Sequence, residues 1–236
     1  MRILGIDTAI PIASAALVEG GDLLAEATQD RLGLTGSHAE VILPLIQTVF
    51  DRVQVPVDGL CGIAVSIGPG SFTGLRIGLA TAKGMAFESK LPLVGISTLH
   101  AAAARLRNFD GLIASVLDAR KNEIYAALFR RRQNELSRLT ADAVLPVASA
   151  IELLREHQED GEPLVLIGSG AQAYESEFTA SLGASARIIS DAGYSSVAAQ
   201  AALLAQARFA AGEVDDSGTL APVYLRASEA EHNRKN

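Results

Sequence analysis

The side chains that could carry catalytic chemistry are few and widely spaced along the chain. The single cysteine, Cys61, excludes an internal disulfide and a cysteine-rich zinc site, and its apolar neighbours predict a buried thiol. Neither an HExxH nor a GxSxG motif occurs. A serine precedes one histidine, at 37–38, but this pair is more typical of a helix start. The histidines share no metal-ligand spacing; they are His38, His100, His157 and His232. We therefore predict neither catalytic residues nor a metal site.

Phosphoryl transfer is the chemistry that the remaining polar residues come nearest to supporting. It needs a metal, donors around the phosphates and a group that positions the nucleophile. The turn after Asp7, at residues 8–12, contains no glycine, and Pro11 removes a backbone donor. The turn after Asp118, at residues 119–122, is more polar but also lacks glycine. Both aspartates are favoured as turn caps or partners of a cation, with residual metal or nucleotide contact as the alternative.

A glycine-rich segment follows residues 68–70 and is expected to be helical. Gly70, Gly74, Gly78 and Ala82 are four residues apart and therefore share one helix face. Each helical glycine costs about 1 kcal/mol relative to alanine, so a compensating contact is expected. That contact is another backbone at close range, either the protein's own sheet or a helix of a partner.

A second predicted helix begins at Ser37, which forms a capping box with Glu40. Apolar residues then recur at helical spacing as far as Val53, and Pro44 should bend the helix. The apolar stripe is wider than one core contact needs. Periodicity alone still favours an ordinary core helix, and a partner-binding helix is the alternative.

Two halves of the chain are expected to contain the same elements in the same order. The first half has predicted strands at 2–6, 12–18, 23–29, 60–67 and 92–96, with helices at 37–53 and after 70. The second has predicted strands at 112–117, 123–129, 135–141, 163–167 and 186–190, with helices at 148–157, after 170 and at 195–211.

Matching motifs support an internal duplication. Asp7 and Asp118 are each followed, after identical gaps, by Ala-Ala-Leu. Each half later places Ile-Gly-x-Gly at a strand end, at 67–70 and 167–170. Two matches in the same order predict an α/β protein built of two β-β-β-α-β-α subdomains.

This plan resembles the actin, sugar kinase and Hsp70 ATPase superfamily, with a mixed five-stranded sheet in each subdomain. The resemblance implies subdomains at 1–106 and 107–226, with the last helix able to pack back on the first subdomain, and a disordered tail at 227–236. It gives Asp7 and Asp118 the places of metal-orienting carboxylates. It gives Gly168 and Gly170 the place of an adenosine contact. These four residues are a possible vestigial nucleotide or metal site.

A closer resemblance is to the TsaB family, also called YeaZ. It rests on the following segments: Leu4–Ala9, Ser37–Glu40 with Leu43-Pro44, Gly68–Gly78, Ala82–Gly84, Gly95–Leu99, Leu117–Arg120 and Pro222–Arg226. It implies a non-catalytic scaffold or activator subunit, required to place threonylcarbamoyl on adenosine 37 of tRNAs that read codons beginning with A. The implied partners are a TsaD-like catalytic subunit and a TsaE-like ATPase, with a homodimer when alone. ATP or ADP at the partner interface is possible, and the isolated chain requires no cofactor.

The same resemblance argues against catalysis by this chain. TsaD-like proteins carry a metal-binding His-x-x-x-His motif, and the corresponding positions here are Thr98 and Ala102, with His100 isolated between them. The alternative function is an ATP-dependent phosphotransferase or ATPase of the actin-like class. A peptidase is the third and least favoured possibility.

The two predicted helices together form the expected partner surface. Its predicted residues are His38, Glu40, Ile42, Leu45, Ile46, Val49, Phe72, Thr73, Gly74, Arg76, Ile77, Gly78 and Lys83.

Composition limits the other classes of partner. The formal net charge is −7, which disfavours strong binding of nucleic acid by the chain alone, so tRNA is expected to bind only through the complex. The one dense basic cluster, at 130–132, is expected at a solvated hairpin end. The apolar runs are shorter than a membrane span, and the location is expected to be cytoplasmic.

Overall fold

The computed structural model describes residues 1–30, 38–183, 186–189 and 196–226. It divides into two compact units, Met1–Ala101 with Ser195–Tyr224 and Ala102–Tyr194 with Leu225–Asn236. We call these the first and second units. Two of the expectations, the serine of the capping box and the disordered tail, lie outside the described residues.

A five-stranded mixed sheet forms the centre of the first unit. Its strands are β1 (Arg2–Asp7), β2 (Ile12–Glu19), β3 (Asp22–Asp30), β4 (Gly62–Gly68) and β5 (Leu93–Ser97). They lie in the order β3-β2-β1-β4-β5. β1 is antiparallel to β2 and parallel to β4, which is in turn parallel to β5. All five strands were predicted from the sequence.

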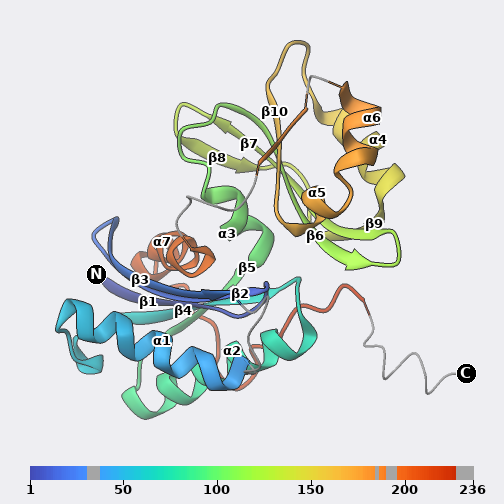
Figure 1. Ribbon diagram of the computed structural model, residues 1–236. Helices are drawn as coiled ribbons and strands as arrows, with labels where there is room; N and C mark the ends of the chain where they lie inside the picture. Colours follow the sequence, from blue (N-terminus) through green and yellow to red (C-terminus); the bar gives the residue numbers. More distant parts are fainter. Residues whose placement is uncertain (31–37, 184–185, 190–195, 227–236) are drawn as a thin grey trace, which may run out of the picture. The chain divides into compact units, whose positions relative to one another are not determined.

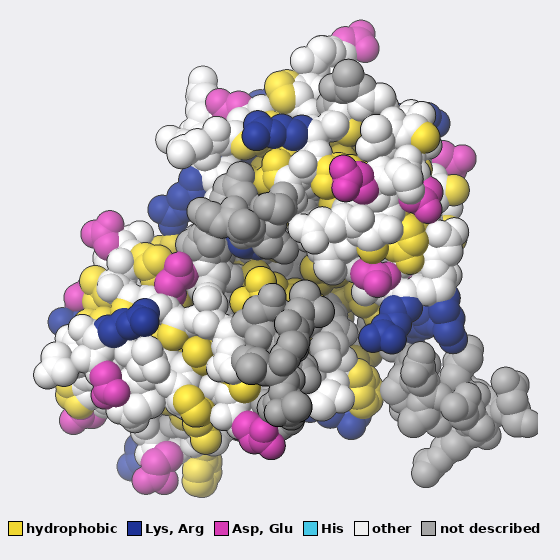
Figure 2. Space-filling view, in the orientation of Figure 1, with side chains coloured by type: hydrophobic (Ala, Val, Ile, Leu, Met, Phe, Trp, Pro, Cys, Tyr) yellow, Lys and Arg dark blue, Asp and Glu magenta, His cyan; other side chains and the backbone are white. Residues whose placement is uncertain are grey.

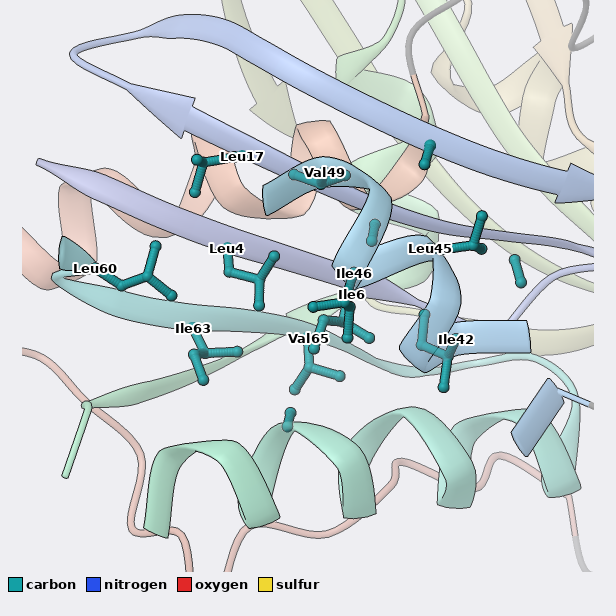
Figure 3. Close-up of a cluster of buried hydrophobic side chains, with 14 of the residues drawn as sticks. Leu4, Ile6, Leu17, Ile42, Leu45, Ile46, Val49, Leu60, Ile63 and Val65 are labelled. Atoms are coloured by element: carbon teal, nitrogen blue, oxygen red, sulfur yellow. The ribbon is translucent and has the colours of Figure 1, made fainter. Parts of the chain in front are cut away.

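Two helices cover one face of this sheet (Figure 1). They are α1 (His38–Val53) and α2 (Phe72–Ser89). Between them and the sheet lies a core in which side chains of α1 point toward those of β1, β2 and β4 (Figure 3). The residues labelled there are Leu4, Ile6, Leu17, Ile42, Leu45, Ile46, Val49, Leu60, Ile63 and Val65. A short 3-10 helix at Val57–Gly59 leads from α1 into β4.

The opposite face of the sheet is covered by α7 (Val197–Ala210), which packs against β1, β2 and β4. A Cβ on Gly5 would overlap the backbone of Ala198, so only glycine allows this approach. Ser196 caps the helix by accepting from the amide of Ala199, and Glu26 accepts from the amide of Ser196 at 2.7 Å. The sequence-based boundary counted this helix with the second subdomain but allowed it to pack back on the first, and in the structure it belongs to the first unit.

The second unit repeats the plan with one extra strand. β6 (Gly111–Arg120), β7 (Glu123–Arg132), β8 (Glu135–Arg138), β10 (Leu164–Ile167) and β11 (Ala186–Ile189) lie in the order β11-β10-β6-β7-β8. β9 (Ala143–Pro146) also pairs with β7, so the sheet has six strands and the prediction of five was wrong here.

Helices pack on one face of this second sheet. They are α4 (Val147–His157), α5 (Ser169–Ala173) and α6 (Glu175–Leu182). The single helix predicted after residue 170 is interrupted at Tyr174, whose φ is −120°. α3 (Thr98–Ala104), which was not predicted, begins in the first unit and ends in the second.

Two expectations about individual side chains were wrong. Cys61 is exposed, because it precedes β4 and lies outside its buried run. The basic cluster lies at the end of the β7–β8 hairpin, as predicted, but only Arg132 of the three is exposed. Arg131 is buried and donates to the carbonyl of Asn134, while Arg130 forms an ion pair with Glu162 at 2.7 Å. None of the described helices has both the length and the apolarity needed to cross a membrane.

Candidate functional site

The hairpin between β1 and β2 is held by the first turn of α2. Thr8 Oγ1 donates to the carbonyl of Gly74 at 2.7 Å, and the amide of Ser71 donates to the carbonyl of Ala9 at 2.7 Å. Thr8 and Ala9 are both buried. The hairpin groups that would face phosphates in an actin-like ATPase thus make contacts within the chain's own first unit.

The small-residue face of α2 packs closely against this hairpin. A Cβ on Gly78 would overlap Thr8 Oγ1, and a Cβ on Gly70 would overlap the carbonyl of Ala9. Ala82 lies in the core beneath the sheet. Of the two options that the sequence left open, the structure shows that the protein's own first hairpin occupies this face, through the Thr8 side chain and the Ala9 carbonyl. The prediction that Gly74 and Gly78 belong to an accessible partner surface is therefore corrected.

The apolar stripe of α1 is also internal. Ile42, Leu45, Ile46 and Val49 are all buried in the core of the first unit, and Ile46 is only 4% exposed. Periodicity identified them as apolar but could not say whether the chain's own sheet or a partner covers them. The expectation that these four residues face a partner is corrected, and the interpretation of α1 as a core helix, which periodicity alone favoured, is confirmed.

Other residues of the two helices remain accessible. Glu40 is exposed, and Leu43, which was not among the predicted partner residues, is 57% exposed. On α2, Thr73 and Arg76 are exposed, while Phe72, Ile77 and Lys83 are half-buried. Phe87, which the sequence analysis did not select, is 83% exposed. The side chain of His38 lies outside the described residues.

A segment near the C-terminus joins this surface. The amide of Val223 donates to the carbonyl of Ile67 at 2.7 Å. The ring of Tyr224 stacks on Phe72 with centroids 4.6 Å apart, and Arg76 Nε donates to the Tyr224 hydroxyl at 2.9 Å. No pattern in the sequence predicted these contacts. The only signal for them was that Pro222–Arg226 is among the segments resembling the TsaB family.

The two aspartates both cap turns. Asp7 is fully buried, and its Oδ1 accepts from the amide of Ala9 at 3.4 Å. Asp118 is exposed, and its Oδ1 accepts from the amide of Arg120 at 2.7 Å and from the hydroxyl of Tyr174 at 3.3 Å. Burial, and then the charge of Asp118, raises the pKa of that tyrosine hydroxyl.

Gly168 and Gly170 permit close packing against the end of β6. A Cβ on Gly168 would overlap the carbonyl of Val116, and one on Gly170 would lie 2.9 Å from the carbonyl carbon of Leu117. Ser169 Oγ between them accepts from the amide of Asp118 at 3.2 Å. These contacts account for both glycines without a ligand, and a vestigial nucleotide role for the four residues remains only a prediction. Within the described part of the chain, no three His, Cys, Asp or Glu side chains gather as a metal site.

The two positions that the family resemblance assigns to the histidines of TsaD-like proteins lie on α3. Thr98 and Ala102 are both buried. His100 is half-buried, and its amide donates to Ser97 Oγ at 3.2 Å. A hydroxyl and a methyl group replace two imidazoles, so this helix does not supply the metal ligands expected of the catalytic relative.

Comparison with known proteins agrees with this architecture. The TsaD family model, described as tRNA N6-adenosine threonylcarbamoyltransferase, matches residues 34–234. A Bacillus subtilis protein named tRNA threonylcarbamoyladenosine biosynthesis protein TsaB is 30% identical over 98% of this chain and 96% of its own. The Escherichia coli protein of the same name is 35% identical over 74% of each chain.

A solved structure shows the same fold. YeaZ from Pseudomonas aeruginosa superposes with a TM-score of 0.77 at 25% identity, covering 95% of this chain and 99% of that one. Each unit of this chain has the topology expected for an actin-like ATPase subdomain. By sequence over nearly its whole length and by its fold, the chain belongs to the TsaB (YeaZ) family of tRNA threonylcarbamoyladenosine biosynthesis proteins.

Proposed function

We propose that the chain is a non-catalytic scaffold or activator in the threonylcarbamoylation of adenosine 37 of tRNAs that read codons beginning with A. It acts in a heterodimer with a TsaD-like catalytic subunit, together with a TsaE-like ATPase. The observation that carries this proposal is that the first hairpin is bonded to the N-terminal part of α2. Its threonine and backbone carbonyl are bonded to α2 rather than left available to a phosphate.

Neither of the two positions on α3 that would hold the metal-binding histidines, 98 and 102, is a histidine, and this supports the same conclusion. Thr98 and Ala102 are buried and cannot replace imidazole ligands. Transfer chemistry is therefore assigned to the TsaD-like partner. The isolated chain needs no cofactor, and any ATP or ADP would be bound at the interface with that partner.

The partner surface is the solvent-facing side of α1 and α2. Leu43 and Phe87 are its exposed apolar side chains, and Thr73, Arg76 and Lys83 add polar contacts. An exposed apolar side chain surrounded by polar groups is typical of a docking surface. In the absence of a partner, the same surface is expected to form a homodimer.

The negative net charge of the chain supports binding of tRNA by the assembled complex and not by this chain alone. The net charge is −7. Within each unit, the side that Figure 2 shows carries both basic and acidic side chains. Such a surface contacts few phosphates, so affinity for tRNA alone should be weak. The chain acts in the cytoplasm, where tRNA is modified.

Reconstitution tests the proposed function. TsaD-like and TsaE-like proteins of the same source are supplied with ATP, threonylcarbamoyl-AMP and unmodified tRNA, with or without this chain. Modified adenosine should form only when the chain is present, and the chain alone should form none and hydrolyse no ATP. Turnover by the chain alone that is lost on mutating Asp7 or Asp118 would instead support the ATPase alternative.

A further inference from the structure

Arg76 lies on the solvent-exposed side of the first turns of α2, in a fixed orientation. Its guanidinium carbon lies 3.9 Å from the centroid of the Phe72 ring, and Nε donates to the hydroxyl of Tyr224. The two aromatic rings are themselves stacked, with an angle of 30° between their planes. Stacking and one hydrogen bond thus restrict a side chain that would ordinarily be flexible.

This orientation leaves one part of the guanidinium available. Nε is used by Tyr224, but among the described residues none accepts a hydrogen bond from the two terminal nitrogens of Arg76. Two parallel N–H groups on a planar, permanently charged fork match a carboxylate and bind it in a bidentate manner. Because the fork is already held in place, little conformational entropy is lost when the carboxylate binds.

The segment that orients Arg76 is itself anchored to the first unit. Gly68 permits this, because a Cβ there would lie only 2.6 Å from the carbonyl of Val223. Val223 and Tyr224 remain 41% and 40% exposed. Exposed aromatic and apolar side chains next to an arginine, on a backbone that is held in place, are typical of the centre of a protein interface.

We propose that Arg76, oriented by Phe72 and Tyr224, binds a carboxylate of the TsaD-like subunit, so that the docking surface extends from α2 onto Val223 and Tyr224. This inference rests on the proposed function and adds the chemistry of the partner group. Arg76 makes the contact, and Tyr224 acts through it as a positioning residue. A nucleobase is a poorer occupant, because the exposed rings already stack on each other and the chain is acidic.

The test measures heterodimer affinity by sedimentation with purified TsaD-like subunit, across a range of salt concentrations. Arg76→Gln should weaken association by about tenfold to a hundredfold and reduce its salt dependence. Tyr224→Phe, which removes only the hydroxyl, should weaken it by about threefold to tenfold. In the Arg76→Gln background Tyr224→Phe should have no further effect, because a positioning residue acts only through its arginine. Lys121→Gln, the same charge change in the second unit, is the matched control.

The outcomes separate this inference from the proposed function. If Leu43→Glu abolishes pairing while Arg76→Gln behaves like Lys121→Gln, the inference fails and the proposed surface stands. If Leu43→Glu and Arg76→Gln both pair normally, the proposed surface fails as well. An equal effect of Tyr224→Phe in both backgrounds would show a merely structural tyrosine and overturn its positioning role. A loss confined to self-association would identify a second copy as the occupant, which also contradicts the proposal. Circular dichroism verifies that each variant is folded.

Discussion

At the scale of single residues, the contact between Thr8 and the glycine face of α2 explains why this helix carries glycine at positions 74 and 78. The hydroxyl of Thr8 lies where a side chain at position 78 would begin, and it donates to the carbonyl of Gly74. Helical glycines are unfavourable, and this packing supplies the compensating interaction. The hairpin is therefore part of the core of the first unit.

Substitution of alanine at two glycines of α2 should have opposite effects. Gly78→Ala forces the new methyl group against Thr8 and should destabilise the protein by about 1–3 kcal/mol. Gly84→Ala, in the same helix, meets open space and should stabilise it by up to about 1 kcal/mol. Urea unfolding measures both. Equal stability of the two variants would show that the hairpin is not tightly packed on α2.

At the scale of elements, sequence patterns located nearly every strand and helix but could not say what covers them. The period of α1 and the four-residue spacing of α2 are the same whether the contact is internal or with another chain. The position of the first sheet and its first hairpin decides this, and it depends on long-range strand pairing. β9 was missed because four residues after a turn carry too little periodicity. The contacts of Tyr224 were missed because they join residues about 150 apart in the sequence.

The burial of α1 gives contrasting expectations for two neighbouring residues. Ile46→Glu places a carboxylate in the core and should destabilise the first unit by more than about 4 kcal/mol. Leu43→Glu changes an exposed side chain and should alter stability by less than about 0.5 kcal/mol. Thermal and urea unfolding followed by circular dichroism distinguish them. A folded Ile46→Glu protein that no longer pairs would restore the original interpretation of α1.

The segment after α7 should make stability depend on pH. Asp215 accepts from the amide of Gly95 at 2.7 Å and pairs with Arg208 at 2.9 Å. Burial alone would raise the pKa of Asp215, but these hydrogen bonds outweigh it and lower the pKa below the ordinary value.

Because the folded-state pKa is depressed, this stabilisation is present above the unfolded pKa of about 3.9 and is lost as pH falls through the lower folded value. Asp215→Asn should reduce the loss of stability in that acidic range while lowering stability at neutral pH. Unfolding measured from pH 7 down to pH 3 tests this. Parallel stability curves for the two proteins would exclude a contribution from Asp215.

At the scale of the whole molecule, the two units share one strand plan, and the residues considered for a nucleotide or metal site make contacts within their own unit. Asp7 and Asp118 cap turns, Gly168 and Gly170 pack against β6, and α3 carries no pair of histidines. The outer side of α1 and α2 remains accessible, and Leu43 and Phe87 are exposed there. The molecule is therefore suited to acting through a partner.

One titration tests this claim most directly. The chain is added in steps to fixed amounts of TsaD-like and TsaE-like proteins, and heterodimer formation and the rate of tRNA threonylcarbamoylation are measured in the same samples. The rate should rise in proportion to the heterodimer and saturate with it. Leu43→Glu should shift both curves together to at least about tenfold higher concentration. Activation by Leu43→Glu without heterodimer, or modification by the chain without its TsaD-like partner, would contradict a scaffold role.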